Sequence, residues 1–348
     1  MVSTLFEALA RDHDVELAAL CFNHGVLSRK LDALGCDVCV IPERTHSFPQ
    51  IVAAARARFR RSGIDVIHSH RVKQHLLAAL LSKAIGAPAV MATIHGLAEP
   101  PRNHGRARPA ERAKPLVDRL LIQRAFRTVV AVSRDMHERL RQGHREMRGD
   151  LIQIHNGIRV PCAPPAAATE SRRVVGSVGR LTAIKDYQLF LATAAEIARV
   201  DPCVRFEILG DGPERAALIE RADALGLGAR FAILPAVDDS IPFYRTLGLY
   251  LNTSVHEGLP LSLLEAMACE RAVVAPPVGG IPEVVESGDG GQGLLAATRD
   301  PAALARCCLD LLADPGRCAA MGRRGRERVM REFSADRMAR AYKATYLQ

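Results

Sequence analysis

Short apolar runs and helical patterns alternate along almost the whole of this 348-residue chain. A strand-length run such as Val174 to Val178 is followed by apolar residues at helical spacing, as from Tyr187 to Arg199. Strands that are joined by helices form parallel sheets, because each crossover returns the chain to the same end of the sheet. The alternation therefore predicts an α/β protein with doubly wound parallel sheets.

The alternation stops once and then starts again, which indicates two domains. Residues 160–168 are rich in Pro and Ala and are typical of a linker. The length also suits two hydrophobic cores better than one. We expect tandem Rossmann-like domains over 1–162 and 163–333, with a cleft between them and a last helix in 334–348.

The stretch from Leu249 to Ala268 predicts a strand, a turn and a helix. Leu249 to Leu251 is a short apolar run, and a polar turn precedes Pro260, which suits the first helical position. The N–H groups at such a helix start can hold a phosphate without a metal. The residues expected at this phosphate-binding start are Gly258, Leu259, Pro260, Leu261 and Ser262.

Two carboxylates, Glu257 and Glu265, flank this helix start at a spacing of eight. One lies beside the expected phosphate site and the other lies along the helix. The pair suits a ligand with hydroxyls on both sides of a diphosphate, which is a sugar nucleotide. The spacing alone favours two ordinary surface glutamates, and it is the surrounding motifs that reverse this preference. A glycosidase would also use two carboxylates, but these two belong to one loop–helix unit.

Glycines and basic residues follow neighbouring strands of the second half. Gly179 allows a sharp turn and a close approach to a ligand, and Arg180 and Lys185 place two positive charges at the same strand end. Such charges can replace a metal at a diphosphate leaving group. Gly210, Asp211 and Gly212 begin like a dinucleotide-binding fingerprint, but Arg215 stands in place of its third glycine, so that interpretation is weak.

Four motifs occur in order: G-R-L-x3-K-D at 179–186, G-D-G-P-E-R at 210–215, H-E-G-L-P-L-S-L-L-E-A-M at 256–267 and G-G-I-P-E-V-V at 279–285. Together they resemble the retaining GT-B glycosyltransferases of family 4, and the resemblance covers nearly the whole chain. It implies a nucleotide-sugar donor of UDP or GDP type, bound as a substrate by the second domain. It further implies an acceptor-side first domain, no cofactor, no metal, and a last helix that crosses back to the first domain.

The resemblance also assigns roles to single residues. Arg180 and Lys185 would bind the diphosphate, Glu257 the donor sugar hydroxyls and Glu265 the ribose. His95, in the sequence T-I-H-G, would reach across the cleft toward the donor sugar. The acceptor hydroxyl would then attack from the face that the diphosphate leaves, so the sugar keeps its configuration.

Histidines gather at two predicted strand ends of the first half. His68, His70, His75 and His95 could form a metal cluster, but no carboxylate stands near them. We favour packing and substrate contact for the first three. For His95 we favour a functional role, because of its motif and its place at a strand end.

Composition excludes several classes. The chain has no Trp and only 4% aromatic residues, whereas modules that stack nucleic-acid bases use more. The most apolar long run, 75–94, is broken by Lys83, Gly86 and Pro88, so we expect no membrane span. Nine scattered cysteines, with one C-x-x-C spacing and no second pair, fit buried thiols in a cytoplasmic protein better than a zinc site.

The charge is unevenly distributed. Residues 1–165 hold 25 Lys and Arg against 15 Asp and Glu, and 102–148 alone hold 13 against 5. Such a patch fits an anionic acceptor or peripheral contact with an anionic membrane face, and it fits a solvated helix surface equally well. Both interpretations stay open.

We therefore expect a cytoplasmic glycosyltransferase that acts on a glycan or lipid-linked acceptor of the cell envelope. The alternatives are a catalytically impaired sugar-nucleotide-binding protein and, less favoured, a nucleotide-sugar epimerase. The impaired form is an alternative because family 4 patterns begin with a strand and a glycine loop before the helix predicted at Val2 to Ala10. Without that strand we expect poor turnover, which a chain extended upstream would restore.

Overall fold

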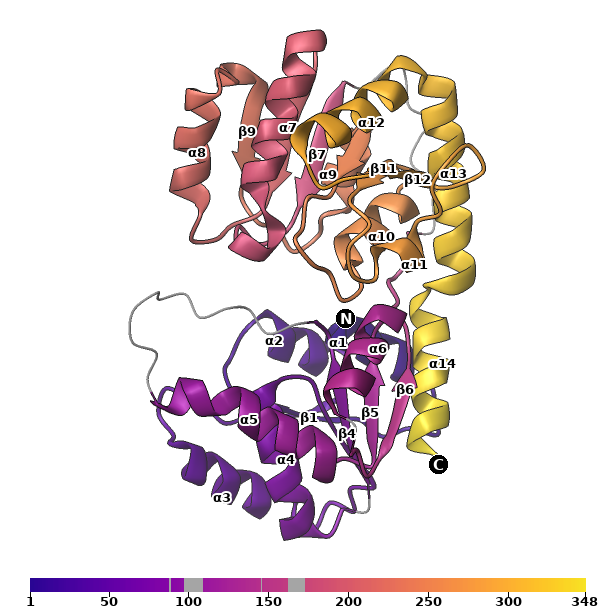
Figure 1. The fold of residues 1–348 in the computed structure, drawn as a ribbon. Coiled ribbons are helices and arrows are strands. Elements are labelled where there is room, and N and C mark those ends of the chain that lie inside the picture. Colours follow the sequence, from indigo (N-terminus) through magenta and orange to yellow (C-terminus); the bar gives the residue numbers. More distant parts are fainter. Residues whose placement is uncertain (88, 97–108, 145, 162–172) are drawn as a thin grey trace. The chain divides into compact units, whose positions relative to one another are not determined.

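The computed structural model describes residues 1–87, 89–96, 109–144, 146–161 and 173–348 (Figure 1). These residues form two compact units. Unit 1 comprises Met1–Gly157 and Ala335–Gln348, and unit 2 comprises Ile158–Ser334. The sequence placed the division after residue 162, whereas the units divide after Gly157; most of the expected linker, 162–168, lies outside the described residues. No helix of the described part is both long and apolar enough to span a bilayer.

Unit 1 contains two parallel sheets. Its elements are α1 (Val2–Leu9), β1 (Ala18–Cys21), α2 (Val26–Ala33), β2 (Asp37–Val40), α3 (Phe48–Phe59), β3 (Val66–Ser69), α4 (Val72–Ile85), β4 (Ala89–Ile94), α5 (Pro109–Arg124), β5 (Thr128–Ala131), α6 (Arg134–Gly143), β6 (Asp150–Gln153) and α14 (Ala335–Tyr346). The larger sheet has the order β3-β4-β5-β6, and β1 and β2 form a separate pair. Among the described residues, β1 and β3 are therefore both edge strands.

Helices cover both faces of the larger sheet. On one face α4, α5 and α6 pack on β4 and β5 through residues such as Ile122 and Met136. On the other face α1 and α14 pack together, and Leu5, Met338 and Tyr342 contact Met91 and its neighbours. In Figure 1 the yellow α14 accordingly lies among the elements of unit 1. The last helix therefore folds with the beginning of the chain.

Unit 2 is built on one continuous parallel sheet. Its elements are β7 (Val174–Val178), η1 (Ala183–Lys185), α7 (Tyr187–Val200), β8 (Arg205–Leu209), α8 (Arg215–Ala224), η2 (Gly228–Arg230), β9 (Phe231–Leu234), α9 (Ile241–Thr246), β10 (Leu249–Leu251), α10 (Leu261–Ala268), β11 (Ala272–Ala275), α11 (Ile281–Val284), β12 (Gly293–Leu295), α12 (Pro301–Ala313) and α13 (Pro315–Glu332). The strand order β12-β11-β10-β7-β8-β9 is doubly wound and places its topological switch point between β7 and β10.

The core of unit 2 explains why these segments form these elements. Alternate residues of the strands, such as Phe206 and Leu249, face α7, α8 and α12 and are fully buried there. The intervening Tyr250 faces the other way, where it donates a hydrogen bond to Ser262 of α10. Both faces of β10 are thus buried, as expected for a central parallel strand.

Three local features were not predicted from the sequence, and one prediction needs correction. Helix α5 begins at Pro109, because Pro suits a first helical turn and the following A-E-R-A-K run favours helix. Pro260 precedes α10 as its N-cap instead of occupying its first position. The short helices α9 and α11 were not predicted, since four to six residues give no periodic window.

We predict that the β1–β2 pair is the least protected sheet of the chain. Two strands of four residues, with no further partner among the described residues, depend on helix packing alone. In hydrogen–deuterium exchange, the amides of β1 and β2 should exchange at least about tenfold faster than those of β4 and β5. The amides of β7 and β8 serve as the control. Equal protection of both sheets of unit 1 would contradict the prediction.

Candidate functional site

Loops at the carboxyl ends of β7, β8, β10 and β11 are joined to one another in unit 2. The Leu181 N–H donates to the Asp211 carbonyl at 2.9 Å, which links the loops after β7 and β8. The Val255 N–H donates to the Ile184 carbonyl at 2.8 Å, and this bond ties the β10 loop to η1. The β11 loop joins the β10 loop through a third backbone bond, described below. These loops therefore form one continuous site at the switch point of the sheet.

Glycines make this packing of loops possible. A Cβ on Gly210 would lie 2.0 Å from the Gly179 carbonyl oxygen, and a Cβ on Gly279 would lie 2.0 Å from that of Glu257. Gly279 also has a φ of +54°, which favours glycine. The neighbouring Gly280 N–H donates to the Glu257 carbonyl at 2.9 Å. Gly210 and Gly279 thus allow close contact between loops, and the close approach to a ligand expected at Gly179 stays a prediction.

Lys185 and Glu257 form the centre of this site. The Lys185 Nζ lies 2.6 Å from the Glu257 Oε1, and the two side chains are only 23% and 11% exposed. Ser254 also donates to the Glu257 Oε1, at 2.6 Å, and the Asn252 amide lies 3.5 Å from the same atom. All of these contacts use Oε1, so Oε2 can accept a hydrogen bond from a ligand hydroxyl. Lys185 likewise has three N–H donors and uses one for Glu257.

The remaining predicted residues lie around this pair. Arg180 is exposed directly after β7, next to Gly179. Asp211 is exposed, and its carboxylate accepts the N–H of Gly212 at 2.8 Å. The helix start of α10 is buried at Gly258, Leu259 and Pro260, and Leu261 is its first residue.

Glu265 lies in α10 and is half-buried. Burial raises its pKa, and two hydroxyl donors oppose that effect. Tyr244 donates to the Glu265 Oε2 at 2.9 Å, and Ser240 donates to the same oxygen at 3.1 Å. Sequence reasoning missed Tyr244 and Ser240, because they stand 21 and 25 residues away, respectively, and carry no motif.

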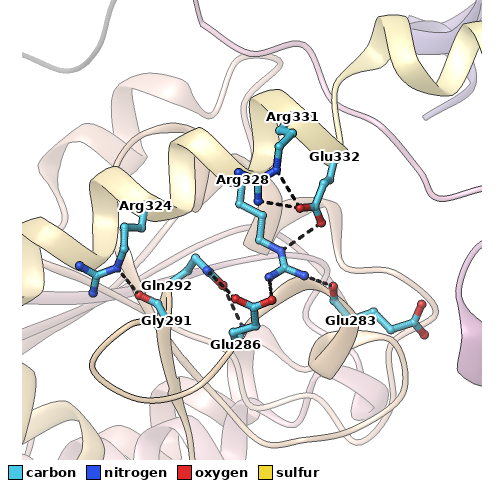
Figure 2. Close-up of polar contacts among 8 residues, drawn as sticks. All are labelled: Glu283, Glu286, Gly291, Gln292, Arg324, Arg328, Arg331 and Glu332. Carbon is cyan, nitrogen blue, oxygen red and sulfur yellow. Dashed lines mark hydrogen bonds and ion pairs between the residues drawn. The ribbon is translucent and has the colours of Figure 1, made fainter.

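Helix α13 holds the segment that follows Gly279 (Figure 2). Arg328 donates to the Glu283 carbonyl at 3.0 Å and forms an ion pair with Glu286. Arg324 donates to the Gly291 carbonyl at 2.9 Å. Figure 2 shows both arginines reaching from the same helix to the loop beneath it. The loop that contacts Glu257 is thus supported from a long, rigid element.

In unit 1, the predicted histidines gather at the carboxyl ends of β3 and β4. His70 Nδ1 lies 3.1 Å from His95 Nε2, and the rings of His68 and His70 are 4.2 Å apart. His68 contacts the hydroxyls of Tyr346 and Thr93 at 2.8 and 2.7 Å. His68 is therefore fixed to α14, whereas His70 and His95 each follow the last residue of their strand.

Burial keeps these imidazoles neutral. It lowers the pKa of His68 to about 3, that of His75 to about 4 and that of His95 to about 4. Within the described ranges, no group of three or more His, Cys, Asp or Glu side chains is arranged to hold a metal ion. Eight described cysteines are free thiols, and Cys203 is exposed, which corrects the prediction that the thiols are buried.

Comparison with known proteins places the chain in a family. The model described as Glycosyltransferase Family 4 matches residues 1–160, and that described as glycosyl transferases group 1 matches residues 172–314. The 2-deoxystreptamine N-acetyl-D-glucosaminyltransferase of Streptomyces fradiae is 32% identical over 305 residues, which are 79% of this chain and 71% of that protein. The chain belongs to glycosyltransferase family 4. This confirms the resemblance drawn from its motifs.

Two further proteins define how far the likeness extends. The D-inositol 3-phosphate glycosyltransferase of Salinispora tropica is 30% identical over 85% of this chain, and the chain spans 66% of that protein's length. The crystal structure of Anabaena HepE in complex with UDP-glucose superposes with a TM-score of 0.81 at 20% identity, over 98% of this chain and 94% of that chain. This family 4 chain therefore has the GT-B fold of two Rossmann-like domains, as predicted.

We predict that the histidines of unit 1 make its stability depend on pH. The pKa values of His68, His75 and His95 lie below the unfolded value of about 6.5. The unfolded chain therefore binds more protons than the folded chain below that pH. The contribution of these histidines to the free energy of unfolding is fully present above pH 6.5 and is lost as the pH falls toward 4. From pH 6.5 to 5.5 each histidine should cost about 1 kcal/mol.

Scanning calorimetry at pH 7.5, 6.5 and 5.5 measures this dependence. In His75→Gln, the fall in the free energy of unfolding between pH 7.5 and 5.5 should be smaller by the contribution of one histidine. This holds whatever the substitution does to stability at pH 7.5. The matched control is His13→Gln, because His13 is exposed. If the free energy of unfolding of His75→Gln falls with pH as steeply as that of the unchanged chain, the prediction for His75 is contradicted.

Proposed function

We propose that this chain is a retaining, metal-independent glycosyltransferase. It moves a sugar from a nucleotide-diphosphate sugar to a cell-envelope or polysaccharide acceptor. One observation carries the donor assignment: the ion pair of Lys185 and Glu257, with N and O 2.6 Å apart. In a sugar nucleotide the diphosphate is bonded directly to the sugar. A cation for the phosphates and a carboxylate for the sugar hydroxyls must therefore stand side by side.

The other residues of the site bind the remaining parts of this ligand. Arg180 and the start of α10 bind the diphosphate, and Glu265 binds the ribose. The relatives named above are glycosyltransferases, and HepE was crystallised with UDP-glucose, which favours a UDP-type donor. The nucleotide sugar is a substrate, and no cofactor is needed.

The reaction breaks the bond between the anomeric carbon and the diphosphate oxygen. The acceptor oxygen bonds to that carbon from the same face, and its proton passes to an oxygen of the leaving diphosphate. Arg180 and Lys185 stabilise the negative charge that develops on the leaving group, which is the role a metal has in other enzymes. His95 contributes a neutral imidazole toward the donor sugar, in keeping with its lowered pKa.

The acceptor and the place of action are proposed from the distribution of charge. The basic charge of residues 102–148 favours a lipid-linked or anionic acceptor. It also favours peripheral contact with the cytoplasmic face of the inner membrane. Residues 102–108 of that patch lie outside the described residues. In the described part, Arg139 and Arg141 are already paired with Asp135 and Glu138 of their own helix.

A second candidate is a sugar-nucleotide-binding protein with little or no transfer. The observation that favours it is the division of the unit 1 sheet between β1 and β3, beside an undivided sheet in unit 2. Binding of a donor without its consumption, in the presence of bacterial glycan acceptors, would favour this candidate. Release of UDP with formation of a product of unchanged anomeric configuration would favour the transferase.

We predict that one nucleotide diphosphate stabilises the chain and that Lys185→Ala abolishes the effect. Lys185 is the only lysine among residues 158–334, so no neighbouring lysine can replace it. Ligand at 100 times its dissociation constant adds about 2.7 kcal/mol, which is a shift of a few degrees in Tm. The measurement is thermal unfolding with UDP, GDP and ADP in turn.

Arg199→Ala is the matched control, since Arg199 is exposed and pairs only with Glu196 of α7 among the described residues. The control should keep the full shift, and so should the unchanged chain dialysed against EDTA. A shift retained by Lys185→Ala would contradict the diphosphate site, and a shift lost with EDTA would contradict metal independence.

A further inference from the structure

The two oxygens of Glu265 are used unequally. Tyr244 and Ser240 both donate to Oε2, at 2.9 and 3.1 Å. Within the described residues, no hydrogen bond of this carboxylate reaches Oε1. A carboxylate oxygen accepts more than one hydrogen bond, so both donors can share Oε2. Oε1 is thereby left to accept from a ligand.

Both donors come from one short element that is fixed by packing. Tyr244 belongs to α9, and Ser240 is the residue at its N-terminus. The ring of Tyr244 is fully buried and lies 5.9 Å from the ring of Tyr250 in β10. Helix α9 also contacts α10, which carries Glu265. The phenol is therefore held in one place relative to the carboxylate.

The charges around Glu265 show what these hydroxyls contribute. Burial raises the pKa of Glu265, Asp239 raises it further, and the bonds from Tyr244 and Ser240 lower it. Burial also raises the pKa of Tyr244, so its phenol stays protonated and donates. Cys269, at the end of α10, has a pKa raised to about 11 and is neutral. Within unit 2, the bonds from these two hydroxyls are thus the largest influences that favour the charged form of Glu265.

We propose that Tyr244 and Ser240 are positioning residues that hold Glu265 ionised, with Oε1 turned toward the ribose hydroxyls of the nucleotide. This rests on the proposed function, in which Glu265 binds the ribose. The site then selects a ribonucleotide over one that lacks both hydroxyls. Tyr244 and Ser240 determine that selectivity without touching the ligand.

The test compares UDP with 2′,3′-dideoxy-UDP by isothermal titration calorimetry, on the unchanged chain and on Tyr244→Phe. The unchanged chain should bind UDP about tenfold more tightly, because the dideoxy compound leaves Oε1 unpaired. Tyr244→Phe should weaken UDP binding about fivefold and change binding of the dideoxy compound less than about twofold. GDP and its dideoxy analogue replace this pair if GDP is the nucleotide that stabilises the chain.

Thr246→Val is the matched control, because it removes one hydroxyl from the same helix. That hydroxyl donates to the Phe243 carbonyl and not to Glu265. The control should bind both nucleotides as the unchanged chain does. If Tyr244→Phe loses the same factor of affinity for UDP and for the dideoxy compound, the substitution has a general structural effect. That result would overturn the proposal.

A pH profile separates positioning from packing. Without the Tyr244 donor, the pKa of Glu265 rises, so UDP affinity should begin to fall at a higher pH in Tyr244→Phe as the solution is acidified from pH 8 to 5. Ser240→Ala should shift the profile the same way by a smaller amount, and it keeps the proposal testable if Tyr244→Phe does not fold. Superimposable profiles would overturn it.

The outcomes distinguish this inference from the proposed function. If the unchanged chain binds none of UDP, GDP and ADP, the proposed function fails. If it binds one of them and prefers the ribose form, but neither variant changes that preference, only the role of Tyr244 and Ser240 fails.

Discussion

The ion pair between Lys185 and Glu257 is the contact on which the site of unit 2 depends. It joins the loop after β7 to the loop after β10, which are neighbouring strands at the switch point of the sheet. The backbone bond from Val255 to Ile184 joins the same two loops, and the bond from Gly280 to Glu257 joins the β10 loop to the β11 loop. A cation and a carboxylate with spare bonding capacity are thereby held together at a partly buried position. Such a pair is costly to keep unless a ligand or further hydrogen bonds use it.

The sequence predicts this site better than it predicts what supports the site. Glu257, Glu265, Arg180 and Lys185 could be chosen because motifs place them at strand ends or helix starts. Asn252 and Ser254, which bond to Glu257, lie in the same polar turn and could have been suspected. Tyr244 could not, since only the fold brings α9 to α10. Gly210 and Gly279 show a different limit: both stand in the motifs, but a sequence pattern does not reveal that each allows close contact between two loops.

The fold was predicted at the level of alternating strands and helices, because burial on both faces gives continuous apolar runs. Element ends and short helices were not, as α5 and α9 illustrate. Unit 1 adds a feature of topology. His68 of β3 and Thr93 of β4 contact the Tyr346 and Tyr342 hydroxyls of α14, so the last helix and the first half of the chain share polar contacts as well as one apolar core. The described strands of unit 1 form two separate sheets, whereas those of unit 2 form one.

The most direct test of the donor site is a crystal structure of the chain grown with UDP. The account predicts the diphosphate within hydrogen-bond distance of Lys185 and the N–H groups at the start of α10, and the ribose hydroxyls at the Glu265 Oε1. A nucleotide bound elsewhere on unit 2, or with its ribose turned away from Glu265 while the Lys185–Glu257 pair stays undisturbed, would contradict the account.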